Sequence, residues 1–149
     1  MDIDSIRPHT LSREECVRLL SSALIGRIVF TDRALPAVEP VDFYVDGGKI
    51  VICTDSSSKV AAATRDTVVA FEADDFDTDA RTGWSVTAVG RTRTVHDPEE
   101  VTRLTGLPPT AWTTGRGDHF IVLHIERISG RRVHRSPSRH ALSPAEHSS

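Results

Sequence analysis

The sequence has little cysteine and no long hydrophobic run, and each absence removes a class of protein. Its two cysteines, Cys16 and Cys53, lie far apart and form no Cys-x-x-Cys pair, so we expect neither a disulfide framework nor a cysteine metal centre. No stretch of eighteen apolar residues is present, and the N-terminal segment MDIDSIRPHT lacks the apolar core of a secretion signal. We therefore expect a cytoplasmic protein with no membrane partner, whose cysteines are small buried side chains.

Lysine is also scarce, and acidic residues slightly outnumber basic ones. The formal net charge is −3, which argues against a nucleic-acid partner. The chain holds only two lysines, Lys49 and Lys59, so each of them draws attention. A length of 149 residues predicts one domain with a substantial core.

Common nucleotide, catalytic and metal motifs are missing as well. There is no G-x-G-x-x-G opening a helix, no phosphate-binding P-loop and no G-x-S-x-G turn, so a nucleotide must be held in another way. Segment 75–79 (DFDTD) begins like a calcium loop, but Ala80 and Val86 stand where glycine and glutamate are required. His119 and His124 are five apart on an expected strand and face opposite sides. We expect no metal site.

What the sequence does contain is mostly strand. Ser12-Arg-Glu-Glu15 is a capping box, and the apolar spacing after it predicts a helix over 12–23. A second helix is expected from the serine cluster to about Arg65, and a third begins at Asp97-Pro98. Residues 74–82 and 106–117 are expected to be loops. Six strands are expected, at 27–31, 38–45, 49–54, 67–73, 83–95 and 119–128, the last either ending there or continuing to 133.

Six strands joined largely by short turns favour a mainly β, closed barrel, because closure removes exposed sheet edges. We expect this domain to span residues 1–135. The remaining segment, 136–149, is rich in serine, proline, histidine and arginine, and is predicted to be a disordered tail.

One local segment suggests a ligand. Thr54-Asp-Ser-Ser-Ser58-Lys59 joins the end of a strand to the start of a helix, where hydroxyls, backbone N–H groups and an ammonium group favour an anion. An ordinary capped helix with an exposed lysine explains the same residues equally well.

Several segments in a fixed order resemble a known family. They are GRIVFTDRALPAVEPVDFYV, KIVICTDSSSK, VVAFEADDFD, TGWSVTAVGRTRTV and ISGRRV. From about residue 12 to residue 134 the chain resembles the pyridoxamine 5′-phosphate oxidase-like FMN-binding split barrels, especially their short bacterial, actinobacterial-type branch. The resemblance implies a six-stranded antiparallel split barrel that forms a homodimer and holds FMN at the dimer interface.

The resemblance also assigns cofactor contacts. Thr54, Ser58 and Lys59, within the cluster that includes Ser57, are implied to hold the FMN phosphate. The segment Val41-Asp42-Phe43 is implied to run beside the flavin ring. Asp42 departs from the family pattern, since a carboxylate cannot donate a hydrogen bond unless it is protonated.

Later positions fit the family less closely. Ser85 stands where true oxidases have a glutamine that contacts the flavin, and Trp84 either stacks near the ring or fills the core. Arg131 and Arg132 either reach a phosphate or lie on a solvated edge strand. The tryptophan of the oxidases' Trp-x-Gly-Arg segment is absent, and the spacing before Arg132-Val-His134 is two residues short. We therefore expect no efficient pyridoxamine 5′-phosphate oxidase.

The resulting function hypothesis is an FMN-dependent oxidoreductase acting on a small molecule. Two alternatives stay open: a reductase that uses the deazaflavin coenzyme, and a binding module for flavin or haem without enzymatic activity. Absorption spectra of the purified protein distinguish all three.

Overall fold

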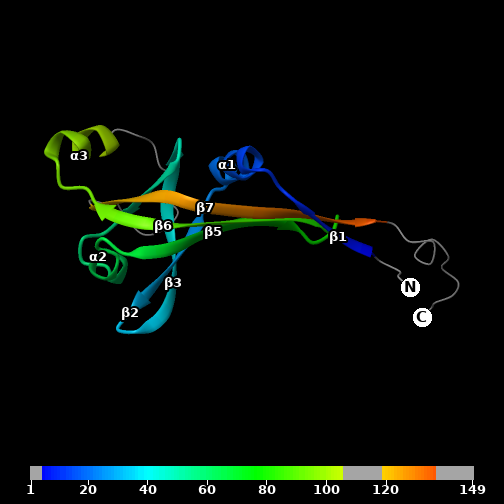
Figure 1. Ribbon diagram of the computed structural model, residues 1–149, viewed down its shortest axis with the longest axis horizontal. Helices are drawn as coiled ribbons and strands as arrows, with labels where there is room; N and C mark the ends of the chain where they lie inside the picture. The colour runs from blue at the N-terminus through cyan, green and yellow to red at the C-terminus, as the bar shows by residue number, and fades with distance from the viewer. Residues whose placement is uncertain (1–4, 106–118, 137–149) are drawn as a thin grey trace, which may run out of the picture.

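Seven antiparallel strands and three short helices make up the chain in a computed structural model, which describes residues 5–105 and 119–136 (Figure 1). Strands dominate, as expected for a mainly β protein. In chain order the elements are β1 (Ser5–Thr10), α1 (Arg13–Ser22), β2 (Gly26–Asp32), β3 (Leu35–Asp46), β4 (Lys49–Thr54), α2 (Lys59–Ala63), β5 (Val68–Asp77), β6 (Thr82–Thr94), α3 (Pro98–Thr105) and β7 (His119–Ser136).

Strands β2 to β7 close on themselves. The strand order is β1-β7-β4-β3-β2-β5-β6, and β6 pairs a second time with β7. This second pairing completes a barrel of six strands, so the predicted barrel is confirmed. β1 adds a seventh strand outside the ring by pairing with the second half of β7, from Ser5 opposite Ser136 to Thr10 opposite Arg131.

The two hairpins that begin the barrel have different turn chemistry. The β3–β4 turn uses Gly47 at a φ of +63°, as the Asp-Gly-Gly sequence predicts. The β2–β3 turn places Arg33 and Ala34 at φ values of +53° and +68°, which is a left-handed conformation that costs energy for residues with a side chain. Barrel pairing on both flanks therefore holds this turn in place.

Helix α1 covers one part of the core. Its predicted capping box is present: Ser12 accepts from the Glu15 amide at 3.1 Å, and Glu15 accepts from the Ser12 amide at 2.9 Å. The buried face of the helix presents Cys16 and Leu20 to the core. Gly130 on β7 allows this close approach, because a Cβ there would lie 2.9 Å from the Cys16 sulfur.

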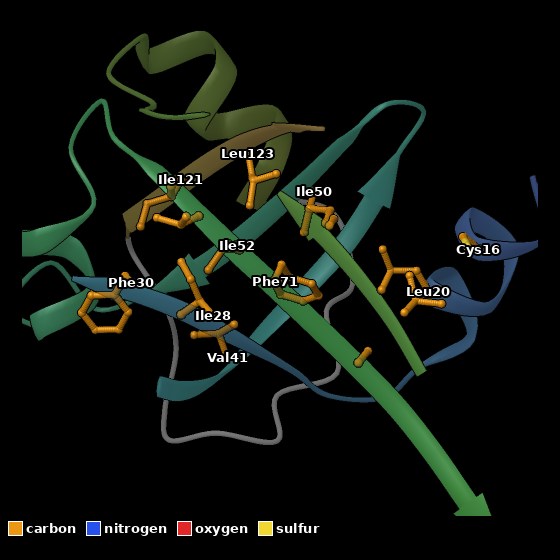
Figure 2. Close-up of a cluster of buried hydrophobic side chains, with 14 of the residues drawn as sticks. Cys16, Leu20, Ile28, Phe30, Val41, Ile50, Ile52, Phe71, Ile121 and Leu123 are labelled. Carbon is orange, nitrogen blue, oxygen red and sulfur yellow. The ribbon is translucent and has the colours of Figure 1, made fainter. Parts of the chain in front are cut away.

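The barrel interior is filled by aliphatic side chains around Phe71 (Figure 2). Phe71 is fully buried, and Phe43 meets it edge to face with ring centroids 4.7 Å apart. A second cluster lies outside the barrel, where α3 packs on β4 and the start of β7. Its buried members are Val51, Val95, Leu104, Phe120 and Val122.

The strands differ most from those predicted at three places. The Ser5–Thr10 strand was not expected, because it contains Pro8 and its partner lies in the last part of β7; an edge strand tolerates proline. β5 continues to Asp77, through a segment predicted to be an acidic loop, because residues 74–77 pair with residues 82–85 of β6. β7 continues to Ser136 since β1 and β6 flank it on both sides.

Two further predictions concern residues wholly or largely outside the described part of the chain: the loop at 106–117 and the tail at 136–149, of which only Ser136 is described. Within residues 5–105 and 119–136, none of the helices has the length and apolar character needed to cross a bilayer.

Candidate functional site

The predicted anion-binding residues gather where β4 ends and α2 begins. The hydroxyl oxygens of Thr54 and Ser58 lie 3.0 Å apart, and both residues are half-buried. Ser58 is also the N-cap of α2, since its hydroxyl accepts from the Ala61 amide at 3.0 Å. The Lys59 side chain is exposed at the first position of the helix. Two hydroxyls, an exposed lysine and the first turn of a helix are therefore neighbours at this junction.

The neighbouring residues form a turn. One Asp55 carboxylate oxygen accepts from both the amide and the hydroxyl of Ser57, each at 3.0 Å. These hydrogen bonds lower the pKa of Asp55, so it stays ionised beside the hydroxyl pair. The Ser57 hydroxyl is thus directed to Asp55 rather than to Thr54 and Ser58.

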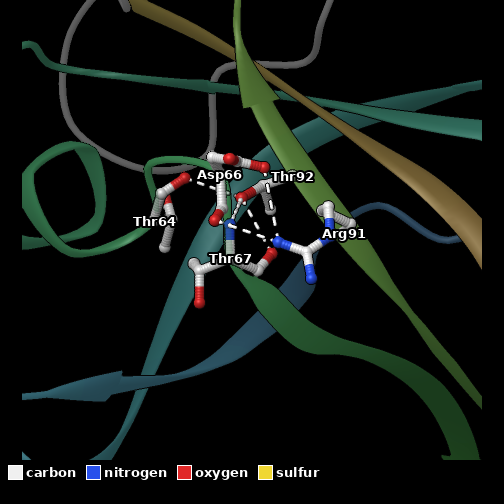
Figure 3. A network of polar contacts seen from close by, with 5 residues as sticks. All are labelled: Thr64, Asp66, Thr67, Arg91 and Thr92. Atoms are coloured by element: carbon white, nitrogen blue, oxygen red, sulfur yellow. Dashed lines mark hydrogen bonds and ion pairs between the residues drawn. The ribbon is translucent and has the colours of Figure 1, made fainter.

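A buried threonine anchors the far end of α2 (Figure 3). The Thr92 hydroxyl lies 2.7 Å from the Thr64 carbonyl oxygen and 3.0 Å from the Thr67 carbonyl oxygen, and it accepts from the Thr67 amide at 3.1 Å. Beside it, Arg91 donates to the carbonyl and carboxylate oxygens of Asp66 at 3.2 and 3.4 Å. The loop after α2 is therefore fixed to β6, which also fixes the Thr54–Lys59 segment.

Replacing Thr92 with valine is expected to destabilise the protein by about 1–3 kcal/mol, because the Thr64 carbonyl oxygen and the Thr67 amide lose their hydrogen bond to the Thr92 hydroxyl. Urea unfolding measures the change. Thr94→Val is the matched control two residues along β6, since the buried Thr94 hydroxyl has no hydrogen-bond partner within the described part of the chain. Equal losses of stability in both variants would contradict the anchoring role.

The residues expected beside the flavin ring lie in two environments. Val41 and Phe43 belong to the barrel core, where Val41 is 3% exposed. Asp42 lies on the other face of β3, opposite Cys53 of β4, and is buried at 6% exposure. Core packing accounts for Val41 and Phe43, and a flavin contact from any of the three remains a prediction.

The remaining predicted contacts occupy opposite faces of the long β6–β7 ribbon. Trp84 pairs with Arg132, and both line a cavity of about 400 Å³. Ser85 pairs with Arg131, and both line a second cavity of about 600 Å³. Trp84 is 8% exposed and packs in the core, so core filling is one of its roles.

These groups are far apart within one chain. Thr54 pairs with His119 at the start of β7, whereas Arg131 lies twelve residues further along the same strand. At about 3.3 Å per residue the separation along the strand is roughly 40 Å, longer than FMN. One chain therefore does not bring Lys59 and Arg131 to the same flavin.

Sequence reasoning missed a charged cluster on the outer face of the barrel. One Arg27 nitrogen on β2 lies 3.0 Å from a Glu72 oxygen and 3.5 Å from an Asp74 oxygen on β5. Burial, then the hydrogen bond and charge of Asp74, raise the pKa of Glu72 to about 7, and Arg27 opposes the shift. Glu72 and Asp74 are two residues apart, a spacing that places both on one face of a strand. They were not paired from the sequence because Asp74 was assigned to a loop.

We expect Glu72→Gln to change how stability depends on pH. Because the pKa of Glu72 is higher in the folded protein than in the unfolded chain, its contribution to stability is fully present below pH 4.5. That contribution is lost as the pH rises through about 7. Between pH 5 and 8 the free energy of unfolding of the wild type should therefore fall by on the order of 1–3 kcal/mol relative to that of the variant. Urea unfolding at both pH values measures this loss, and an unchanged difference between the two proteins would contradict it.

No cluster of three or more histidine, cysteine, aspartate or glutamate side chains suited to a metal ion occurs within residues 5–105 and 119–136. Both cysteines are free, and burial raises the pKa of the Cys16 thiol.

Comparison with known proteins now gives the family. The family model described as pyridoxamine 5′-phosphate oxidase matches residues 12–132. The chain belongs to this family. An uncharacterized protein of Mycobacterium tuberculosis is 41% identical over 128 residues, covering 83% of this chain and 84% of that protein.

Solved structures support the membership of this chain in the pyridoxamine 5′-phosphate oxidase family. The FAD binding protein of Mycobacterium smegmatis is 31% identical with a TM-score of 0.66, over 85% of this chain and 98% of that one. A candidate pyridoxamine 5′-phosphate oxidase from Corynebacterium glutamicum is 26% identical with a TM-score of 0.73, over the same shares. The antiparallel split barrel is therefore the fold of this chain.

Proposed function

We propose that this protein is a flavin-dependent oxidoreductase that holds the phosphate of FMN at the Thr54–Lys59 segment. The observation that carries the proposal is the 3.0 Å approach of the Thr54 and Ser58 hydroxyls at the start of α2, beside Lys59. Hydroxyl and ammonium donors in this arrangement suit a phosphate, whose oxygens accept several hydrogen bonds at once. The FAD binding relative, 31% identical, supports a flavin.

The side chains of the Thr54–Lys59 segment suit a phosphate, except for the carboxylate of Asp55. Thr54 and Ser58 each supply a hydroxyl, and the Lys59 ammonium group offsets the phosphate charge. The ionised Asp55 carboxylate opposes binding unless it stays turned toward Ser57, where its two hydrogen bonds direct it. When bound, a flavin supplies hydride and electron transfer, and the protein supplies binding and orientation.

A homodimer is part of the proposal. The residues that the family resemblance assigns to the cofactor lie at both ends of β7, about 40 Å apart along the strand. Two chains arranged around a two-fold axis bring the Lys59 end of one chain to the Arg131 end of the other. Sedimentation at micromolar concentration is expected to give twice the chain mass of 16.3 kDa, and a monomer would contradict it.

Efficient oxidation of pyridoxamine 5′-phosphate is not expected. The oxidases' Arg-x-His pair corresponds to Arg132 and His134, which line the 400 Å³ cavity with Trp84, on the face opposite Arg131. Misplacing a substrate by about 1 Å can cost on the order of a hundredfold in rate. FMN-loaded protein supplied with pyridoxine 5′-phosphate and oxygen should turn over well below about 1 s⁻¹, near the low end for enzymes. Turnover at that rate would contradict the expectation.

The function is tested by loading the full chain with FMN and, separately, with FAD. Bound flavin should bleach under anaerobic reductant, such as a nicotinamide nucleotide or dithionite, and recover its blue-region bands with oxygen. A preparation that binds neither flavin, and instead shows the single violet band of a deazaflavin or the Soret band of haem, would contradict the proposal.

A further inference from the structure

A row of apolar side chains crosses the outer face of four neighbouring strands, β3, β2, β5 and β6. Val29 of β2 lies opposite both Val38 of β3 and Ala70 of β5. Ala70 in turn lies opposite Val89 of β6. Val38 is 59% exposed, and the other three members of this apolar row are half-buried. In the described part of the chain, α1 and α2 pack into the barrel core and α3 packs on β4 and β7, so no helix packs on the row.

The Arg27–Glu72–Asp74 cluster lies on the same face, directly beside the apolar row. Arg27 precedes Val29 by two residues on β2, and Glu72 follows Ala70 by two residues on β5, so these side chains share one face. One Arg27 nitrogen lies 3.0 Å from Glu72 and 3.5 Å from Asp74. A single guanidinium group offsets only one of two carboxylates, so the cluster is negative when both acids are ionised.

This face continues to residues that the proposed homodimer brings together. Asp74 lies opposite Ser85, and Ser85 lies opposite Arg131. In that homodimer the Arg131 end of one chain approaches the Lys59 end of the other, so the face that carries Arg131 turns toward the partner. An apolar patch bordered by charges of both signs suits a two-fold interface, in which the same patch of each chain meets its copy.

We propose that a second copy of this chain docks on the apolar row, and that proton uptake by the Glu72–Asp74 pair strengthens the association of the two copies. This assignment rests on the homodimer of the proposed function, and it adds the contact face and the dependence on pH. It concerns the outer face of β2, β3, β5 and β6 rather than the flavin phosphate at Lys59.

The direction of the coupling follows from a count of charges. Each chain brings two carboxyl groups and one guanidinium group to the interface, so a pair of chains brings four and two. With every acid ionised, two negative charges stay uncompensated, whichever chain each Arg27 pairs with, and burying them costs free energy. One proton per chain removes the excess.

That proton is available near neutral pH. Burial, followed by the hydrogen bond and charge of Asp74, raises the pKa of Glu72 to about 7. The neighbouring strands present Arg27 on β2 and Thr87 on β6 to Glu72. No ion pair in the described part of the chain joins either acid to the remaining charged groups of this face, which are Arg91 with its partner Asp66, Arg127 and Arg131. The dimer should therefore weaken as pH rises through about 7.

The contact face is tested by placing a charge in the apolar row. Val38→Glu should raise the Kd of the dimer on the order of tenfold or more, because the two-fold axis brings two copies of the new charge into one interface. Leu24→Glu is the matched control, since Leu24 is 64% exposed but lies between α1 and β2, outside the row. Sedimentation of the full chain measures Kd, and circular dichroism checks the fold. Equal Kd values for the two folded variants would overturn the assignment of the face.

The proton coupling is tested by the same measurement at pH 6 and pH 8. The wild-type dimer should dissociate on the order of tenfold more readily at pH 8. Glu72→Gln should remove this difference and stay as tightly associated as the wild type at pH 6. A pH dependence that persists in Glu72→Gln, as titration of a histidine would give, overturns the coupling. If the dimer stays intact at nanomolar concentration, exchange between isotopically labelled and unlabelled chains gives the same comparison as a rate.

Each measurement is made on the full chain both stripped of flavin and loaded with FMN, which separates this inference from the proposed function. A dimer that dissociates in Val38→Glu but binds no flavin contradicts the flavin proposal alone. A dimer that binds flavin and tolerates Val38→Glu contradicts the contact face alone. A chain that is monomeric in both states at micromolar concentration overturns the contact face together with the homodimer.

Discussion

Lys59→Ala is expected to weaken flavin binding about ten- to hundred-fold without unfolding the protein. The Lys59 side chain is exposed at the start of α2 and contributes to no core cluster, so its removal spares the barrel. A charge-assisted hydrogen bond to phosphate is worth roughly 1.5–3 kcal/mol, which converts to this range of affinity. Quenching of flavin fluorescence on titration with protein measures the change.

Lys49→Ala is the matched control for this variant. It removes the only other lysine, which lies at the opposite end of β4 from Thr54. Flavin affinity should be unchanged in Lys49→Ala. If both lysine variants lose affinity equally, the effect is one of net charge, and the placement of the phosphate beside Lys59 is wrong.

Gly90→Ala is expected to destabilise the barrel by on the order of 4 kcal/mol or more. β6 and β7 change register between Val89 and Gly90, and a Cβ at Gly90 would lie 1.8 Å from the His124 carbonyl oxygen. That oxygen belongs to the backbone of β7, so it moves only if the strand pairing that closes the barrel shifts. For a chain of this length the loss corresponds to a fall in Tm of about 8–16 °C.

Gly48→Ala tests whether this effect is specific to the closure of the barrel. Gly48 lies in the β3–β4 turn, has no heavy atom near the Cβ position and does not adopt a positive φ. Its variant should unfold within a few degrees of the wild type in a thermal scan. A stable Gly90→Ala protein would mean that the β6–β7 pairing differs from the one described.

The parts of the fold that could be predicted from the sequence are those that depend on neighbouring residues. The Ser12–Glu15 capping box and the Asp46-Gly47-Gly48 turn each act within a few residues, so their structures follow from adjacent side chains. By contrast, β1 and the last part of β7 support each other across more than 120 residues, and neither segment is a clear strand by itself. Likewise, residues 74–77 become strand only because β6 pairs with them.

The candidate sites divide in the same way. Thr54 and Ser58 lie four residues apart, and the strand-to-helix junction that brings their hydroxyls together could be predicted. The Arg27–Glu72 contact depends on the pairing of β2 with β5, which the sequence alone does not reveal. The sequence alone also does not reveal which face of the β6–β7 ribbon each residue occupies. Arg131 and Arg132 are consecutive, yet they line different cavities on opposite faces.

The flavin assignment is tested by an equilibrium titration of the full chain, stripped of any bound cofactor, with FMN and with FAD. Flavin fluorescence and absorbance report binding, and circular dichroism reports the fold. We expect saturable binding of one flavin per chain with a low-micromolar or tighter Kd, weakened by Lys59→Ala but not by Lys49→Ala. A folded protein that binds neither flavin at high micromolar concentration would contradict it.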